Sequence, residues 1–180
     1  MKRNTPTLLL SIICCLFMAS CNTATPEKCF DIAVLNSDFL VGFASDGQLS
    51  KLESPSIKMG KTKDEFAPML RKEVINTKMA FIEETFEKIK DLQETTDTKD
   101  IRLASIALYE YVLPVYKTEY VALAKMYDEG ASKEQTRAGG AAISNNHYSK
   151  FEELYGKLIS SGKLYAEKNN IKLNRNVGRM

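Results

Sequence analysis

The sequence predicts an all-α protein, an up-down antiparallel helical bundle of about four helices that follows a cleaved N-terminal leader. Two observations support this prediction. Apolar residues recur at spacings of three and four over long stretches, which is the period of one face of an α-helix. Short turn-forming segments separate these stretches, and short connections are typical of helices that run antiparallel to their neighbours.

Residues 1–20 have the features of a signal peptide. Lys2 and Arg3 provide a positive start, and residues 8–19 form an apolar run that only Ser11 interrupts. A helix that spans a bilayer needs about 20 apolar residues. The run therefore predicts a cleaved signal rather than a permanent transmembrane helix.

Met18, Ala19, Ser20 and Cys21 end this run, and together they resemble the lipobox of bacterial lipoproteins, although Met18 stands where most members have leucine. The resemblance covers only the first 21 residues. It implies that Cys21 becomes the first residue and carries acyl chains such as palmitate, which make the membrane a partner. Several chains hold a protein firmly, since each buried CH₂ contributes about 0.8 kcal/mol. The alternative is an ordinary secretory signal cut at the same small residues.

Asn22 follows the cysteine. In lipoproteins of Gram-negative bacteria, an aspartate at this place often retains the protein in the inner membrane. The resemblance therefore implies the outer membrane of the cell envelope, and it leaves the periplasmic and the surface-exposed face open. We expect residues 21–28 to be a lipidated polar tether, 29–170 a helical bundle domain, and 171–180 a polar tail.

The first part of the domain is the most ambiguous. We expect a helix over 27–52, because apolar residues continue past the length of a strand, although a short strand over 30–35 is an alternative. Residues 54–62 contain proline, glycine and serine, which predict a loop. Residues 63–93 give the clearest helix, with Pro68 near its first turn and charges such as Lys78 on the remaining arc.

Two further helices follow. The third covers 98–129, and Pro114 in its middle predicts a kink because proline lacks a backbone donor. Ser132 and Gln135 predict a capping box at the start of the fourth, which extends to about Lys168. Gly139-Gly140 should weaken this helix.

The chain ends with Tyr165-Ala166 and Asn169-Asn170-Ile171. This ending is distantly similar to that of uncharacterised helical lipoproteins of Gram-negative bacteria. That family implies no known activity.

Composition excludes some classes of function. Once the leader is removed, 23 basic residues balance 23 acidic ones. A neutral domain lacks the positive charge of a nucleic-acid-binding protein. Cys14 and Cys15 leave with the leader, so Cys29 stands alone if Cys21 is lipidated, and a disulfide scaffold is not expected.

The tyrosines have an unusual distribution, because all eight lie between Tyr109 and Tyr165. Their spacing places four of them, Tyr109, Tyr116, Tyr120 and Tyr127, on one side of the third helix, and Tyr148, Tyr155 and Tyr165 share one side of the fourth with Phe151. Together these sides could be a groove or partner surface lined with amphipathic rings, or a core whose rings bury their bodies. The residues that would form the binding surface are Tyr109, Tyr116, Tyr120, Tyr148, Phe151 and Tyr155.

The sequence shows no recognisable catalytic or metal set. His147 is the only histidine and has no glutamate three residues before it, so the Glu-x-x-His motif of di-metal bundles is missing. A single histidine cannot supply a histidine-rich zinc site, and neither a G-x-S-x-G elbow nor a phosphate-binding glycine loop is present. We expect no cofactor and no enzyme activity.

We therefore expect a lipid-anchored, non-catalytic envelope protein that acts as an interaction module for a protein or another envelope component. One alternative is a carrier of an apolar ligand, with tyrosines and methionines around an internal cavity. The second alternative is an envelope hydrolase, which would depend on His147.

Overall fold

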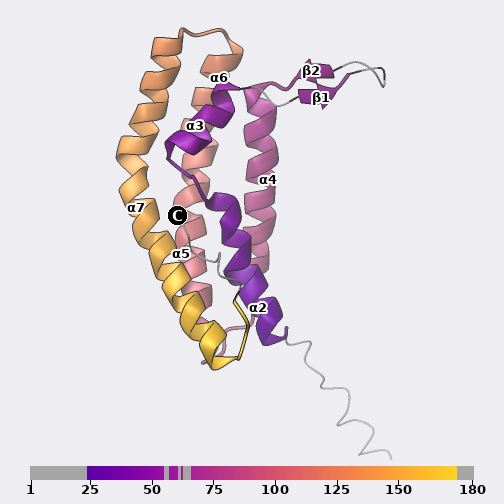
Figure 1. The fold of residues 1–180 in the computed structure, drawn as a ribbon, viewed down its shortest axis with the longest axis vertical. Coiled ribbons are helices and arrows are strands. Elements are labelled where there is room, and N and C mark those ends of the chain that lie inside the picture. The colour runs from indigo at the N-terminus through magenta and orange to yellow at the C-terminus, as the bar shows by residue number, and fades with distance from the viewer. Residues whose placement is uncertain (1–23, 55–56, 61, 63–65, 174–180) are drawn as a thin grey trace, which may run out of the picture.

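The computed structural model describes residues 24–54, 57–60, 62 and 66–173. Within them the protein is mainly helical, with one small two-stranded sheet (Figure 1). The predicted signal peptide, Cys21 and residues 174–180 of the predicted tail lie outside the described residues. In chain order the elements are α2 (Pro26–Ala33), the 3₁₀ helix η1 (Leu35–Leu40), α3 (Asp46–Glu53), β1 (Ile57–Met59), β2 (Phe66–Pro68), α4 (Arg71–Lys90), α5 (Lys99–Val115), the π-helical turn η2 (Tyr116–Tyr120), α6 (Val121–Asp128) and α7 (Lys133–Lys168).

Three long helical segments form the body: α4, the continuous series α5–η2–α6, and α7. Successive segments run in opposite directions, and α5 contacts both α4 and α7 (Figure 1). The expected single helix over 27–52 is wrong, because α2, η1 and α3 divide this stretch. Gly42 and Ala44 have φ angles of 84° and 54°, which an α-helix does not accommodate. The prediction of a mainly helical protein is confirmed, whereas a four-helix up-down bundle is not.

The sheet is a second departure from the sequence prediction. β1 lies in the expected loop over 54–62, and β2 lies where the helix over 63–93 was expected to begin. The true helix α4 starts at Arg71, because the backbone N–H groups of Arg71 and Lys72 donate to the carboxylate of Asp128 at 2.8 and 2.9 Å. An acidic side chain at the end of α6 thus provides acceptors for free donors in the first turn of α4.

The expected capping box at the start of α7 is confirmed. Ser132 Oγ accepts from the N–H of Gln135 at 3.2 Å, and Gln135 Oε1 accepts from the N–H of Ser132 at 2.9 Å. The helix continues through Gly139 and Gly140, where the side chains of Leu123 and Leu49 pack against the bare backbone. The glycines therefore mark close packing rather than a break.

Pro114 lies in the last turn of α5, and the helix does not end there. The next residues form the π-helical turn η2, after which α6 continues in the same series. A π turn is one of the known ways in which a helix accommodates a proline. The hydroxyl of Thr118 donates to the carbonyl of Pro114 at 2.9 Å, which satisfies an acceptor within the widened turn.

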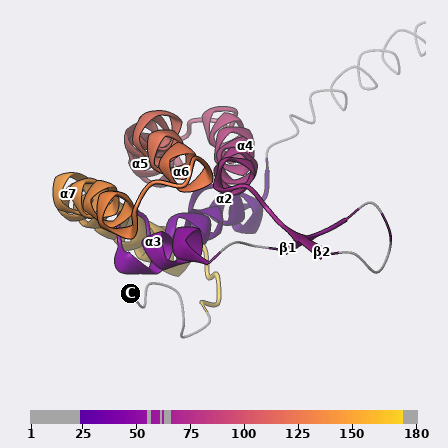
Figure 2. The same ribbon diagram turned by 90° about the horizontal axis from the view of Figure 1, so that it is seen from above.

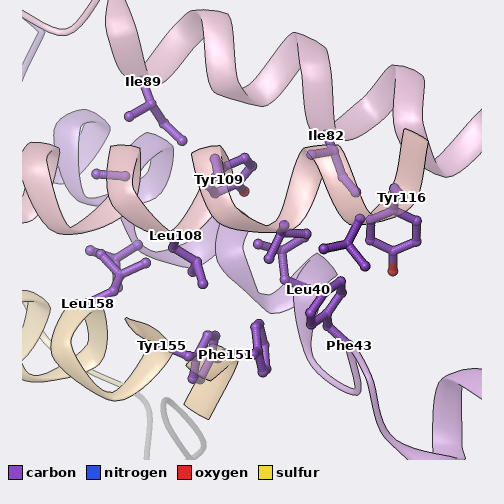
Figure 3. Packing of buried hydrophobic residues seen from close by; sticks show 14 of the residues in the cluster. Leu40, Phe43, Ile82, Ile89, Leu108, Tyr109, Tyr116, Phe151, Tyr155 and Leu158 are labelled. Atoms are coloured by element: carbon purple, nitrogen blue, oxygen red, sulfur yellow. The ribbon is translucent and has the colours of Figure 1, made fainter. Parts of the chain in front are cut away.

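The core lies between α4, α5 and α7, and the first segment of the chain closes it (Figure 3). Ile82 and Ile89 extend from α4, Leu108 from α5 and Leu158 from α7, and all four are buried. Leu40, at the end of η1, lies among them. The apolar core of the helical body is thus completed by the short 3₁₀ helix η1.

Candidate functional site

The predicted tyrosine surface is the first candidate. Five of its six side chains are buried, whereas Tyr148 on α7 is 39% exposed. The interpretation as an exposed groove is therefore wrong for these five, and the alternative of a core is what the structure shows. The five buried residues are Tyr109, Tyr116, Tyr120, Phe151 and Tyr155.

Phe43 explains why no groove is left. Its ring centroid lies 5.1 Å from that of Phe151 and 5.7 Å from that of Tyr116 (Figure 3). The ring centroid of Tyr120 is 5.9 Å away. These are ordinary distances for packed aromatic pairs. The segment that carries Phe43 comes from the N-terminal third of the chain, and it fills the space that the two tyrosine-bearing helices would otherwise expose.

The buried hydroxyls fasten the same segment to the helices. Tyr109 donates to the carbonyl of Asn36 at 3.2 Å, and Tyr155 donates to the carboxylate of Asp38 at 3.3 Å. Tyr120 accepts from the backbone N–H of Ala44 at 2.9 Å. These tyrosines therefore serve as structural ties, with hydroxyls directed at backbone and side-chain groups between residues 36 and 44.

His147 forms the second candidate. Its Nδ1 lies 2.8 Å from the hydroxyl of Tyr111, and its Nε2 lies 2.6 Å from a carboxylate oxygen of Glu119. The order carboxylate, imidazole, hydroxyl is that of a catalytic triad. The hydroxyl here is a phenol, and burial followed by the charge of Glu119 raises the pKa of Tyr111. Both effects oppose formation of the phenolate, so the arrangement is suited to joining α7 to the η2 turn.

The β1–β2 hairpin is the third candidate. Its register pairs Ile57 with Pro68 and Met59 with Phe66. Directly opposed residues, and residues two apart on one strand, share a face of the sheet. All four side chains are therefore on one face, and Ile57, Met59 and Phe66 are 65–71% exposed. We call the face formed by these four residues the hairpin apolar face.

The opposite face of the hairpin is directed toward α4. Lys58, which alternates with Ile57 and Met59, forms an ion pair with Glu73 of α4 at 2.6 Å. Hydrogen bonding from Lys58 lowers the pKa of the Glu73 carboxyl. This contact fixes which side of the hairpin meets the helix, so the hairpin apolar face is left without a partner among the described residues.

The hairpin projects from the body at the end of α4 that is farthest from the start of α2. Figure 1 shows the hairpin beside the first turn of α4, with α2 beginning at the opposite end. Seen from above, it extends away from all the helices (Figure 2). Leu70, which is 53% exposed, adds a further apolar side chain where the hairpin joins α4.

Other site classes receive no support within the described ranges. They contain no group of three or more His, Cys, Asp or Glu side chains placed to hold a metal ion. None of the described helices combines the length and the apolar character needed to cross a bilayer. Cys29 is free and buried, and burial raises the pKa of its thiol, which opposes the reactive thiolate.

Comparisons with protein-family models, with curated proteins and with solved structures find no match to this chain. Sequence reasoning missed the hairpin apolar face; the alternation of Ile57, Lys58 and Met59 was its one available signal.

Proposed function

We propose that this protein is a lipid-anchored, non-catalytic protein of the bacterial envelope, and that it binds a protein partner through the hairpin apolar face. In this proposal the body is an up-down bundle, and α2, η1 and α3 together occupy the place of its first helix. Cys21 is the proposed lipidation site, and the outer membrane is the proposed location. The observation that carries the proposal is the one-sided apolar hairpin, whose apolar face has no partner among the described residues.

The place of the hairpin favours a protein over the anchoring membrane. Residues 21–26 reach at most about 18 Å when fully extended, so the start of α2 stays near the anchor. The hairpin lies at the other end of α4, a helix of 20 residues that is about 30 Å long. If the anchored protein is oriented with the long axis of α4 pointing away from the membrane, the hairpin therefore lies in the aqueous compartment.

Charge around the hairpin points the same way. Lys58 is neutralised by Glu73, and residues 60–65 carry two lysines and two acids. Anionic lipid surfaces are recognised by clusters of basic residues, and this region has no net positive charge. An apolar cleft on a protein partner, which accepts the exposed rings and aliphatic chains, suits the face better.

The test is site-specific photo-crosslinking in cells of the native host. A photoreactive residue at Ile57 should yield one discrete protein adduct, and a photoreactive residue at Met59 should yield the same one. Adding Phe66→Ser on the same face should abolish the adduct from position 57 while the protein stays anchored. Leu164 on α7, which is 68% exposed, is the matched control position and should not give this adduct.

Three outcomes would overturn the proposal. Adducts with lipid would make the hairpin a membrane contact, and an adduct with a second copy of this chain would make it a dimer interface. Equal adducts from Leu164 and from the hairpin would mean that the face has no selectivity.

Lipid anchoring needs its own measurement. Intact-mass analysis of the protein from its host should find a chain that begins at residue 21 and carries acyl chains. A bare Cys21 or a retained leader would contradict this part of the proposal. The alternative of an apolar-ligand carrier is less favoured, because the aromatic side chains expected around its cavity contact one another in the core.

A further inference from the structure

A surface pocket between η1, α3 and α4 contains a concentration of hydrogen-bond donors. Its volume is about 420 Å³, and none of its lining residues is acidic. Pockets that bind small organic ligands range from roughly 300 to 1,000 Å³. Two lysines, Lys51 from α3 and Lys78 from α4, are part of the lining.

Lys78 is unusually placed for a lysine. Its ammonium lies 5.5 Å from the ring centroid of Tyr116 and donates one hydrogen bond, 3.0 Å long, to Oε1 of Gln48. It forms no ion pair with a described carboxylate, and burial, followed by the nearby charge of Lys51, lowers its pKa to about 8. A partly buried ammonium without an anion is costly in free energy. An anion bound in the pocket would compensate the charge of Lys78.

Gln48 is a second polar group of the pocket. Its side chain is 3% exposed, and its oxygen is occupied by Lys78. Gln48 also lines the pocket. The bond to Lys78 fixes the orientation of the amide, and its N–H₂ group is the donor that a ligand oxygen in the pocket would meet.

The apolar side of the pocket is provided by Phe39 and Val74. Phe39 is half exposed and stacks on Phe81 of α4, with ring centroids 3.9 Å apart. A ring held in this way is a preformed platform for a hydrocarbon group. Donors at one side and an aromatic platform at the other define a ligand with a charged head and an apolar portion.

We propose that this pocket binds a small organic anion, a carboxylate or a phosphate monoester with a short apolar chain. Lys78 and the Gln48 amide contact its oxygens, Lys51 adds long-range attraction, and Phe39 contacts its chain. This site is separate from the hairpin apolar face and does not depend on the proposed protein partner.

The test is calorimetric titration of the full mature domain with hexanoate, hexyl phosphate and, as the neutral probe, 1-hexanol. Both anions should bind, and hexanol should bind at least about tenfold more weakly, because it has no negative charge to pair with the Lys78 ammonium. A preference between the two anions identifies the head group. Equal binding of hexanol and hexanoate would overturn the proposal.

Two lysine variants of α4 provide the matched comparison. Lys78→Met keeps a long unbranched side chain and should lose at least about tenfold in affinity for the anions. Lys72→Met, six residues earlier on the same helix and outside the pocket lining, should bind as the unchanged protein does. Unchanged affinity in Lys78→Met would also overturn the proposal. Its folding is checked by circular dichroism and melting temperature, because the variant also leaves the buried Gln48 oxygen without its donor.

The pH dependence gives a separate readout. The titratable groups facing Lys78 are Lys51 on α3 and Tyr116 on η2, and Tyr116 stays neutral here because burial raises its pKa. Affinity for hexanoate should therefore fall as pH rises above about 8, where Lys78 of the free protein loses its proton. Constant affinity up to pH 10 would show that an ordinary surface lysine, and not Lys78, holds the anion.

Discussion

The layer of buried rings, formed by Phe43 and the five buried aromatic residues of the predicted tyrosine surface, and the hairpin apolar face both consist largely of apolar side chains. Their environments are opposite. Phe151 on α7 is 1% exposed, and Phe66 on β2 is 71% exposed. The first contacts Phe43 and Tyr155, whereas the second faces outward from a two-stranded sheet. Packing within the core thus accounts for the buried rings, whereas no packing contact among the described residues accounts for the apolar side chains of the hairpin apolar face.

This difference determines where function should be sought. Exposed apolar residues scattered singly are normal, but a contiguous face on a projecting element is an indicator of binding. The tyrosines are unusual in the sequence and ordinary in the structure. Ile57, Met59 and Phe66 are ordinary in the sequence and unusual in the structure.

The largest expected effect is that of removing a ring from the buried layer. Phe151→Ala should lower the free energy of unfolding by about 3–5 kcal/mol, through lost burial and the cavity left behind. Urea unfolding followed by circular dichroism measures it. A loss below about 1 kcal/mol would mean that the layer repacks freely, and the contrast with the hairpin would fail.

Alkaline pH should act on the same layer. Burial raises the pKa of Tyr120 and of Tyr155 to about 12, whereas an unfolded tyrosine titrates at about 10. A raised folded pKa means that this stability is fully present below pH 10 and is lost as pH rises toward 12. Urea unfolding between pH 8 and 12, in the Lys78→Met background to remove that lysine's opposite contribution, should show the decline. Titration of these tyrosines at pH 10 without loss of helix would contradict their burial.

Removing the hydroxyl oxygen should have different effects on stability at Tyr120 and at Tyr116, although the two rings stack on each other. Tyr120→Phe leaves the buried N–H of Ala44 without an acceptor and should cost about 1–3 kcal/mol. Tyr116→Phe is the matched control, since the Tyr116 hydroxyl has no partner among the described residues, and its cost should be near zero or negative. Equal costs in chemical unfolding would show that the bond from Ala44 contributes nothing.

The smallest effect is expected at the hairpin. Phe66→Ser and Met59→Ser should each change the free energy of unfolding by no more than about 0.5 kcal/mol, because exposed side chains lose little on truncation. Urea unfolding is again the measurement. A cost above about 2 kcal/mol for either variant would show that the hairpin apolar face is covered by another part of this chain.

The sequence predicted the last two long helical segments well. Apolar spacing and the Ser132–Gln135 capping box place α7 within a residue of its observed ends, because such local signals depend on few distant contacts. It could not separate β2 from α4. Pro68 fits both the first turn of a helix and the end of a strand, and the choice is made by Asp128, which is distant in sequence and fixes the start of the helix at Arg71.

The candidate sites were less accessible to sequence reasoning. A helical face of rings has the same spacing whether a neighbour covers it or not, and only the fold reveals Phe43 on top of it. Lys78 was expected on the solvated arc of its helix. It is half-buried because η1 and α3 pack beside α4, and the distances involved cannot be obtained from periodicity.

The π turn η2 has a consequence for changes in chain length. It accommodates its residues with a wider spacing than an α-helix, and α6 begins with its faces set by that spacing. A π turn contains about one residue more than an α-helical turn, so deleting one residue between 116 and 120 can convert it to regular α-helix. Leu123 and Ala124 would then keep their buried side. The same deletion in the regular part of α5 would turn everything after it by about 100° around the helix axis and should therefore be far more damaging.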